Sequence, residues 1–215
     1  MTLTADLYFS FRSPYSYLAI GRYRAMGEEY NFDITLRPVW PLAVRQPDFF
    51  ERNHPNWLGY TMRDVIRVAQ FYGIPFGPPM PDPIVQDVQT RQISADQPYI
   101  EPITRMGQAA ARRGKGVAFA HEAGRQIWGG SKDWHEHDQL ARVCERAGLD
   151  FDQLHDEAAS DAAALDTQIA ANQADLESAG HWGVPTVVFQ NEPFFGQDRI
   201  EMARWRMEQS GLEKR

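Results

Sequence analysis

The chain has 215 residues, of which 43% are hydrophobic and 24% are charged, a composition typical of one large domain or of one domain with a substantial insertion. Its formal net charge of −7 argues against nucleic acid or an anionic membrane surface as the main partner. The single cysteine, Cys144, excludes an intrachain disulfide. The sequence has no recognisable signal segment and no apolar run long enough to span a bilayer, so we expect a cytoplasmic protein.

The first 40 residues predict a strand, a helix and a second strand. Residues 5–11 are apolar and rich in aromatic side chains, as in a short buried strand. Pro14 suits the first turn of a helix, where its missing N–H costs nothing, and Ser13 suits the N-cap. The helical pattern continues to about Tyr30, and alternating apolar side chains at 32–37 predict the next strand. We expect a parallel βαβ unit.

The middle of the chain is predicted to be helical. Residues 57–72 carry an apolar side chain every three or four positions, which predicts a helix that ends at Gly73. The segment from Gly73 to Pro83 holds five prolines in eleven residues and predicts an ordered loop. From about Glu101 to Gly180 the helical periodicity and the glycine breaks predict four or five helices and no strand.

The end of the chain returns to strands. Residues 184–190 form a β-branched run, Asn191 and Glu192 predict a hairpin turn, and "PFFG" predicts a second short strand before a closing amphipathic helix over 199–211. Short pieces of this kind could hardly fold alone. We therefore predict one discontinuous sheet domain made of residues 1–45 and 180–215, with a helical insertion over 46–179.

Three motifs agree with one another. "SPYS" at 13–16 opens the first helix where thioredoxin-like redox proteins carry Cys-Pro-x-Cys, "GVPT" at 183–186 opens a strand, and "FGQDR" at 195–199 follows the last strand. With the length and the helical middle, they make the chain resemble the kappa-class glutathione transferases. Their bacterial relatives, the 2-hydroxychromene-2-carboxylate isomerases, are the nearest match. The resemblance implies an α/β, thioredoxin-like fold of the DsbA branch with a large all-helical insertion.

The resemblance also implies a cofactor and the residues that hold it. In this family a serine replaces the nucleophilic cysteine, and glutathione brings the sulfur; the matching residue is Ser13. A cis Val184–Pro185 bond would present the Val184 main chain to the peptide-like ligand. Gln197 and Asp198 would hold the γ-glutamyl end, with Asp198 also capping the last helix. Asn53, with Asn56 as the alternative, would contact glutathione from the loop after the second strand.

The physics of the predicted site agrees with the resemblance. A thiol with a pKa near 8.5 is only slightly ionised at neutral pH. Unpaired N–H groups and the dipole of a helix N-terminus can lower a thiol pKa by about one to several units. A thiolate can add to a conjugated enone, and bond rotation followed by expulsion of the thiolate completes a cis–trans isomerisation. The resemblance, which this chemistry supports, implies a glutathione-dependent isomerase of aromatic unsaturated keto acids that acts as a homodimer.

Two other functions stay open from the residues alone: a glutathione transferase that releases the adduct, and a non-catalytic DsbA-like binding protein without the redox cysteines. Both rivals would use the same pocket, so turnover separates them.

The remaining candidate residues have simpler interpretations. We expect Arg12 to be exposed, although it could add positive charge beside the thiolate. Cys144 lies on an apolar helical pattern and is predicted to be buried. The histidine spacing matches no metal motif, so no metal site is expected. Tyr60, Asp64 and Arg67 predict a surface ion pair on their helix, and the aromatic residues Trp40, Trp57 and Phe76 are candidates to line a substrate cleft.

Overall fold

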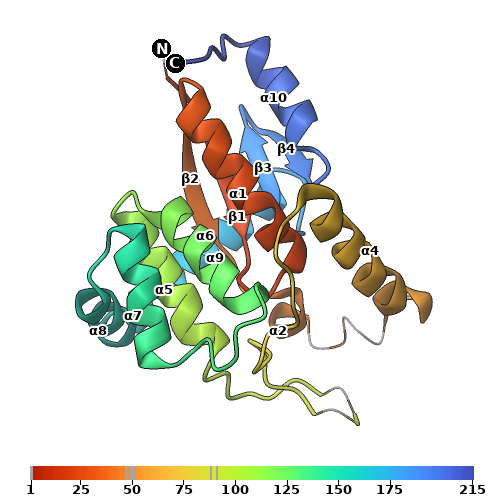
Figure 1. Cartoon of the computed structure of the whole chain (residues 1–215), viewed down its shortest axis with the longest axis vertical. Coiled ribbons are helices and arrows are strands. Elements are labelled where there is room, and N and C mark those ends of the chain that lie inside the picture. Colours follow the sequence, from red (N-terminus) through yellow and green to blue (C-terminus); the bar gives the residue numbers. More distant parts are fainter. Residues whose placement is uncertain (1, 47, 49–51, 88, 91) are drawn as a thin grey trace.

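A four-stranded sheet forms the centre of the molecule (Figure 1). The structure is a computed structural model and describes residues 2–46, 48, 52–87, 89–90 and 92–215. The strands are β1 (Leu3–Phe9), β2 (Phe32–Pro38), β3 (Thr186–Phe189) and β4 (Glu192–Phe195). Their order is β2-β1-β3-β4; β1 pairs parallel with β2, whereas β3 is antiparallel to both β1 and β4. The predicted βαβ and ββα units thus lie in one sheet.

Helices connect and cover this sheet. They are α1 (Pro14–Glu29), α2 (Leu42–Arg45), α4 (Asn56–Tyr72), α5 (Ile100–Arg112), α6 (Gly116–Trp128), α7 (His137–Ala147), α8 (Phe151–Ser160), α9 (Ala162–Ser178) and α10 (Ile200–Glu208). Five of them, α5 to α9, fill the stretch for which four or five were predicted. Among the described residues, no helix is both long and apolar enough to cross a bilayer.

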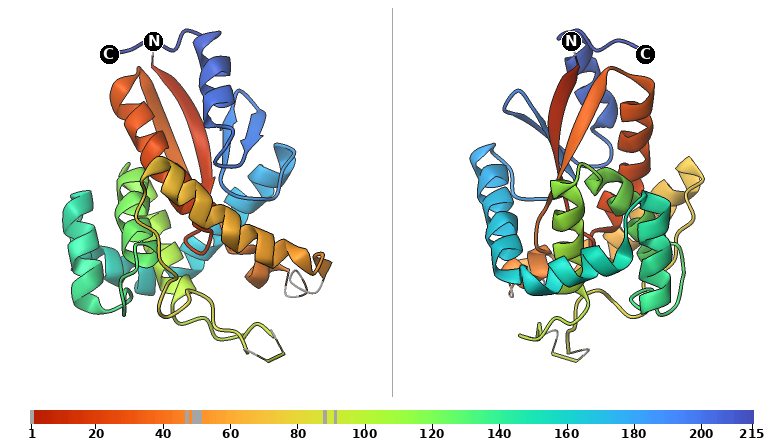
Figure 2. Two further views of the ribbon diagram at one scale, coloured as in Figure 1. Left: turned by 45° about the vertical axis from the view of Figure 1, so that its right-hand side comes forward. Right: turned by 90° about the vertical axis from the view of Figure 1, so that its left-hand side faces the viewer.

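The two faces of the sheet bury different side chains. Alternate residues of β1 point to opposite faces, so Leu7 and Phe9 join the large core with α1, whereas Tyr8 packs with Val39 and Leu176 in a smaller cluster. Leu176 belongs to α9, which lies across the strands from α1 in the right-hand view of Figure 2. The sheet therefore packs against α1 on one face and against α9 on the other.

Two boundaries and the burial of one helix differ from the predictions. The first strand covers 3–9 rather than 5–11, because Ser13 N–H donates to the Ser10 carbonyl and turns the chain before the helix. The hairpin turns at Gln190 and Asn191, both with positive φ, one residue before the predicted position. The predicted apolar face of 57–72 is buried only at Val65 and Ala69, so α4 leaves most of its apolar residues exposed.

Candidate active site

Ser13 caps the helix that leaves the centre of the sheet. It has extended backbone angles (φ −92°, ψ 114°), and its Oγ accepts a hydrogen bond from the Ser16 N–H at 3.2 Å. Pro14, at the first helical position, has no N–H, and the Tyr17 N–H donates to the Ser13 carbonyl at 3.2 Å. Among the described residues, the Tyr15 N–H has no partner in this first turn and can donate to a ligand. The predicted N-cap is confirmed.

The loop that carries Val184 and Pro185 lies against this cap. The bond between the two residues is cis, as predicted. The Ser13 hydroxyl donates to the Val184 carbonyl at 3.4 Å, a long bond near the limit of hydrogen-bond geometry. The Thr186 hydroxyl donates to the Gly183 carbonyl at 2.7 Å, and the Gly196 N–H donates to the Pro185 carbonyl at 2.8 Å. The loop is therefore fixed on both sides and joins Ser13 to the end of β4.

Gln197 and Asp198 follow immediately at that end. Gly196 has a φ of +108°, and a Cβ there would meet Asp198 Oδ1 at 2.5 Å, so the turn requires glycine. The Gln197 carbonyl accepts from Arg22 of α1 at 2.7 Å, and Asp198 forms an ion pair with Arg199 at 2.5 Å. The prediction that Asp198 is the N-cap is wrong: Arg199 holds that position without a side-chain cap, because α10 starts one residue later than expected.

A polar contact ties α4 to the start of α1. The Tyr15 hydroxyl donates to Asp64 Oδ2 at 2.8 Å, and Arg67 pairs with the same carboxylate at 3.0 Å, as the predicted surface ion pair requires. Burial, the hydrogen bond to Asp64 and the charge of Asp64 raise the pKa of Tyr15 well above its ordinary value, with a smaller effect from Asp198. Tyr15 therefore stays neutral and donates its hydroxyl proton to Asp64.

Arg12 is not exposed as expected. Its guanidinium donates to both carboxylate oxygens of Asp82, at 2.6 and 2.8 Å, and only 24% of its side chain is exposed. It also lies 5.8 Å from the ring of Trp128. Because Asp82 neutralises Arg12, this arginine adds no net positive charge beside Ser13. Instead, the ion pair attaches the proline-rich segment to the turn that precedes Ser13.

Aromatic side chains surround the site on two sides. Phe76 stacks on Trp128 with ring centres 5.8 Å apart, and Trp128 Nε1 donates to the Phe11 carbonyl at 3.0 Å. Next to Val184, His181 stacks between Trp182 and Phe195, with ring centres 4.7 and 4.0 Å away. Burial lowers the pKa of His181, and its Nδ1 accepts from the Gly183 N–H at 2.9 Å. The ring is therefore neutral and part of the stack.

The remaining predicted residues lie farther along the chain. Asn53 is half-buried in the segment between α2 and α4, and its contact with a ligand stays a prediction. Trp40 and Trp57 are also half-buried. Cys144 is fully buried, as predicted, and burial raises its thiol pKa to about 12. Among the described residues, no three His, Cys, Asp or Glu side chains gather as a metal site would require.

Three contributors were not anticipated from the sequence: Arg22, Asp64 as an acceptor for Tyr15, and Asp82. Each meets a partner at least 49 residues away along the chain. Of the three, only Asp64 could be recognised from the sequence, by its spacing from Arg67. That spacing predicted an ion pair on the surface of their helix and not the hydrogen bond to Tyr15.

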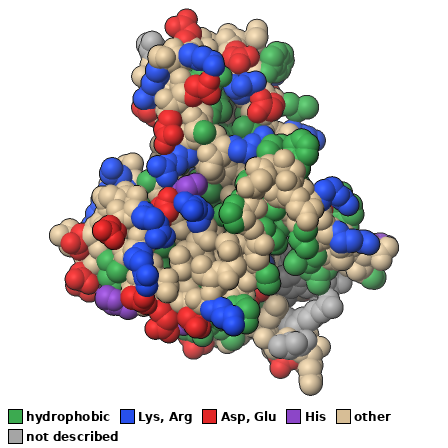
Figure 3. All heavy atoms as spheres, viewed as in Figure 1, with side chains coloured by type: hydrophobic (Ala, Val, Ile, Leu, Met, Phe, Trp, Pro, Cys, Tyr) green, Lys and Arg blue, Asp and Glu red, His purple; other side chains and the backbone are tan. Residues whose placement is uncertain are grey.

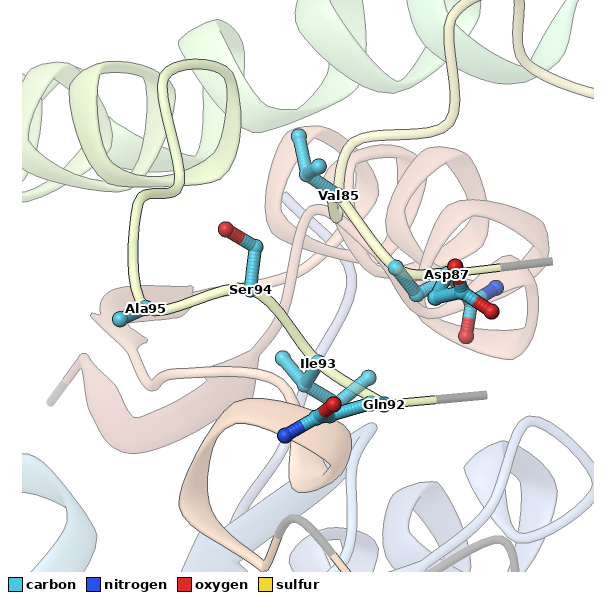
Figure 4. Close-up of a pocket in the computed structure, with 7 residues that line it drawn as sticks. Val85, Asp87, Gln92, Ile93, Ser94 and Ala95 are labelled. Carbon is cyan, nitrogen blue, oxygen red and sulfur yellow. The ribbon is translucent and has the colours of Figure 1, made fainter. Parts of the chain in front are cut away.

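A separate hollow lies between the two arms of the segment that follows Asp82 (Figure 4). Its walls are formed by side chains such as Val85, Ile93 and Ser94, and none of the residues at the Ser13 cap lines it. We assign it no part in the candidate site.

The chain is similar to known proteins over nearly its whole length. A family model described as a DSBA-like thioredoxin domain matches residues 4–208. A 2-hydroxychromene-2-carboxylate isomerase of Pseudomonas sp. (strain C18) is 25% identical over 206 residues, which are 94% of this chain and 89% of that protein. One from Sphingobium xenophagum is 26% identical and covers 94% and 96%. A solved structure of 2-hydroxychromene-2-carboxylate isomerase, 24% identical, superposes with a TM-score of 0.72 over 96% of this chain and 95% of that one. The predicted thioredoxin-like fold is confirmed.

Proposed function

The chain belongs to the DSBA-like thioredoxin domain family, and from this premise we propose that it is a glutathione-dependent cis–trans isomerase of the 2-hydroxychromene-2-carboxylate type. Its substrates would be aromatic unsaturated keto acids, in line with the 2-hydroxychromene-2-carboxylate isomerases to which it is similar. The observation that carries the proposal is the Ser13 hydroxyl, which stands at the N-terminus of α1 against the Val184 carbonyl where redox relatives need a cysteine.

The groups around Ser13 fit glutathione. Asp198 offers an exposed carboxylate for the ligand ammonium group, and the adjacent N–H groups of the turn before α10 suit a carboxylate. The Val184 main chain suits a peptide unit of the ligand. The Arg22 bond to the Gln197 carbonyl keeps this turn in place. These acceptors and donors thus match the ammonium, carboxylate and amide groups that glutathione carries.

Ser13 can cap the helix and bind sulfur at the same time. A hydroxyl has one proton to donate and two lone pairs to accept with. The Ser13 Oγ accepts a hydrogen bond from the Ser16 N–H, so the hydroxyl proton is still available to donate to a ligand. The present acceptor, the Val184 carbonyl, is 3.4 Å away, and such a long bond is easily exchanged for one to an anionic sulfur.

When bound, glutathione supplies the sulfur nucleophile that reversible addition to a conjugated double bond requires. The protein contributes the donors that favour the ionised form: the Ser13 hydroxyl, the Tyr15 N–H and the dipole of a sixteen-residue helix. Tyr15 is itself held by Asp64, which fixes the first turn against α4.

The test is calorimetric titration of glutathione into the wild type and into Ser13→Ala, with the pKa of the bound thiol followed by its ultraviolet absorbance. We expect one-site binding in both and a thiol pKa that is depressed in the wild type and closer to the free value in the variant. Asp150→Ala is the matched control, because it removes an N-cap bond to Gln153 N–H (2.9 Å) on α8, away from the site. Equal thiol pKa values in wild type and Ser13→Ala would contradict the role of the hydroxyl.

Turnover separates the isomerase from its two rivals. Conversion of 2-hydroxychromene-2-carboxylate without consumption of glutathione supports an isomerase. Formation of a released glutathione conjugate with electrophiles would indicate a transferase, and binding without turnover would indicate a binding protein. The homodimer also remains a prediction, which light scattering on the purified chain checks.

A further inference from the structure

A second polar hollow lies on the face where α1, α6 and α7 meet. It is lined by Arg125, Arg146, Gln126 and Ser131, with Tyr17 and Pro75 as its apolar wall. The Tyr17 hydroxyl donates to the Pro75 carbonyl at 2.5 Å, which closes that wall. Among the described residues it shares no lining residue with the Ser13 site, although Tyr17 lies one helical turn beyond Ser13.

One buried carboxylate organises the charges behind this hollow. Glu122 has 6% of its side chain exposed and accepts from Arg146 Nε at 2.8 Å. Arg24 approaches the same carboxylate at 3.4 Å and Arg125 at 4.0 Å. Burial alone would raise the pKa of Glu122, but hydrogen bonds from Arg146 and His121 outweigh it and the pKa is lowered. Glu122 is therefore an ionised anchor for Arg146.

These contacts leave positive charge uncompensated. One Glu122 charge faces three guanidinium groups, and among the described residues only Arg24 has a further carboxylate partner, Glu28 at 3.0 Å. Figure 3 shows the result as blue side chains gathered where α1, α6 and α7 lie in Figure 1. Such an excess stands out in a chain with a net charge of −7.

The two arginines that line the hollow keep free donors. Arg146 uses Nε for Glu122, so its two terminal amino groups remain, and its side chain is 43% exposed. Arg125 stands beyond hydrogen-bond distance of Glu122 and is 59% exposed. Gln126 is held through its amide nitrogen by Gln139 at 2.9 Å, which fixes its place at the rim. Two planar donor groups at one hollow match the two or three oxygens of an oxyanion.

We propose that this hollow is a second ligand site, which binds the carboxylate or phosphate group of a small molecule between Arg125 and Arg146. Ser131 adds a hydroxyl, and the Tyr17–Pro75 wall receives the carbon skeleton of the ligand. The site is independent of the proposed isomerase activity, since its residues take no part at Ser13.

The experiment titrates inorganic phosphate and, separately, phthalate into the full chain at constant ionic strength, with calorimetry as the readout. We expect saturable one-site binding of at least one of them, with a dissociation constant of about 1 mM or tighter. The anion that binds more tightly identifies the class of ligand. Arg125→Gln should weaken binding about tenfold, which corresponds to the loss of one charge-assisted hydrogen bond.

Two controls make the result decisive. Arg142→Gln removes an exposed arginine of α7 that pairs with Asp138, and it should leave binding unchanged. Ser13→Ala should also leave it unchanged. Absence of saturation with both anions, equal binding by Arg125→Gln and wild type, or loss of binding in Ser13→Ala would each overturn the proposal. Arg125 is 59% exposed and reaches Glu122 only at 4.0 Å, so its replacement should not unfold the chain, and a thermal melt verifies this.

Discussion

At the scale of single residues, Asp198 offers the most direct probe of how a ligand is held. Its carboxylate is exposed and paired with Arg199. We predict that Asp198→Asn weakens glutathione binding about tenfold, because one hydrogen bond between charged groups is lost. Calorimetry with a deaminated glutathione analogue provides the control: this analogue lacks the ammonium group, so the variant and the wild type should bind it equally. An equal loss of affinity for both ligands would show that Asp198 does not bind the ammonium group.

Arg12 and Asp82 form the second residue-scale case. The pair is partly buried and bidentate, and Asp82 also accepts from the Ile84 N–H at 3.0 Å. We predict a coupling free energy of about 1 kcal/mol between Arg12→Leu and Asp82→Asn, measured by urea unfolding of both single variants and the double variant. A coupling near zero would mean that the contact does not hold the proline-rich segment to the site.

At the scale of elements, the approach of α5 to the end of the first strand depends on one glycine. A Cβ at Gly107 would meet the Phe11 ring at 2.5 Å. We predict that Gly107→Ala lowers the free energy of unfolding by about 1–3 kcal/mol, as overpacking does in a filled core. Gly59→Ala is the matched control on α4, where a Cβ would meet nothing within 4 Å, and it should stabilise the chain by about 0.5–1 kcal/mol. Thermal or urea unfolding of both variants measures whether the free energy of unfolding falls in Gly107→Ala and rises in Gly59→Ala.

At the scale of the whole molecule, the buried tyrosines predict how stability depends on alkaline pH. Burial raises the pKa of Tyr8 to about 12 and raises the pKa values of Tyr15, Tyr17 and Tyr23 as well. The unfolded chain ionises first, near pH 10, while the folded chain keeps its protons. Stability should therefore be fully present below pH 10 and fall above it, by up to about 1.4 kcal/mol per pH unit for each such tyrosine.

Tyr23→Phe isolates one of these contributions. The Tyr23 hydroxyl is buried and, among the described residues, has no hydrogen-bond partner. The variant should be as stable as the wild type or more stable at pH 7, and its stability should fall less steeply above pH 10. Urea unfolding at pH 7, 10 and 11 measures both effects. An unchanged alkaline slope would show that Tyr23 does not contribute to it.

Features that depend on neighbours along the chain could be predicted from the amino-acid sequence. The strand, the cap at Ser13 and the helix after Pro14 follow from local patterns, and so does the end of α4 at Gly73. The hairpin turn and the start of α10 each lie one residue from the predicted position, and the position of the hairpin turn depends on the pairing of β3 with β4. The three motifs, together with the length and the helical middle, also identified the family, since each motif is short and contiguous.

Contacts between residues that are distant in the sequence became known from the three-dimensional structure. Arg12 with Asp82, Tyr15 with Asp64 and Arg22 with Gln197 are separated by 70, 49 and 175 positions. The same holds for Arg146, which reaches Glu122 from another helix and opens toward the second hollow. The residues next to a charged side chain in the sequence do not indicate its distant partner, because that partner depends on how the helices pack on the sheet. For the same reason α4 could be predicted as a helix, but the exposure of its apolar side depends on what packs against it.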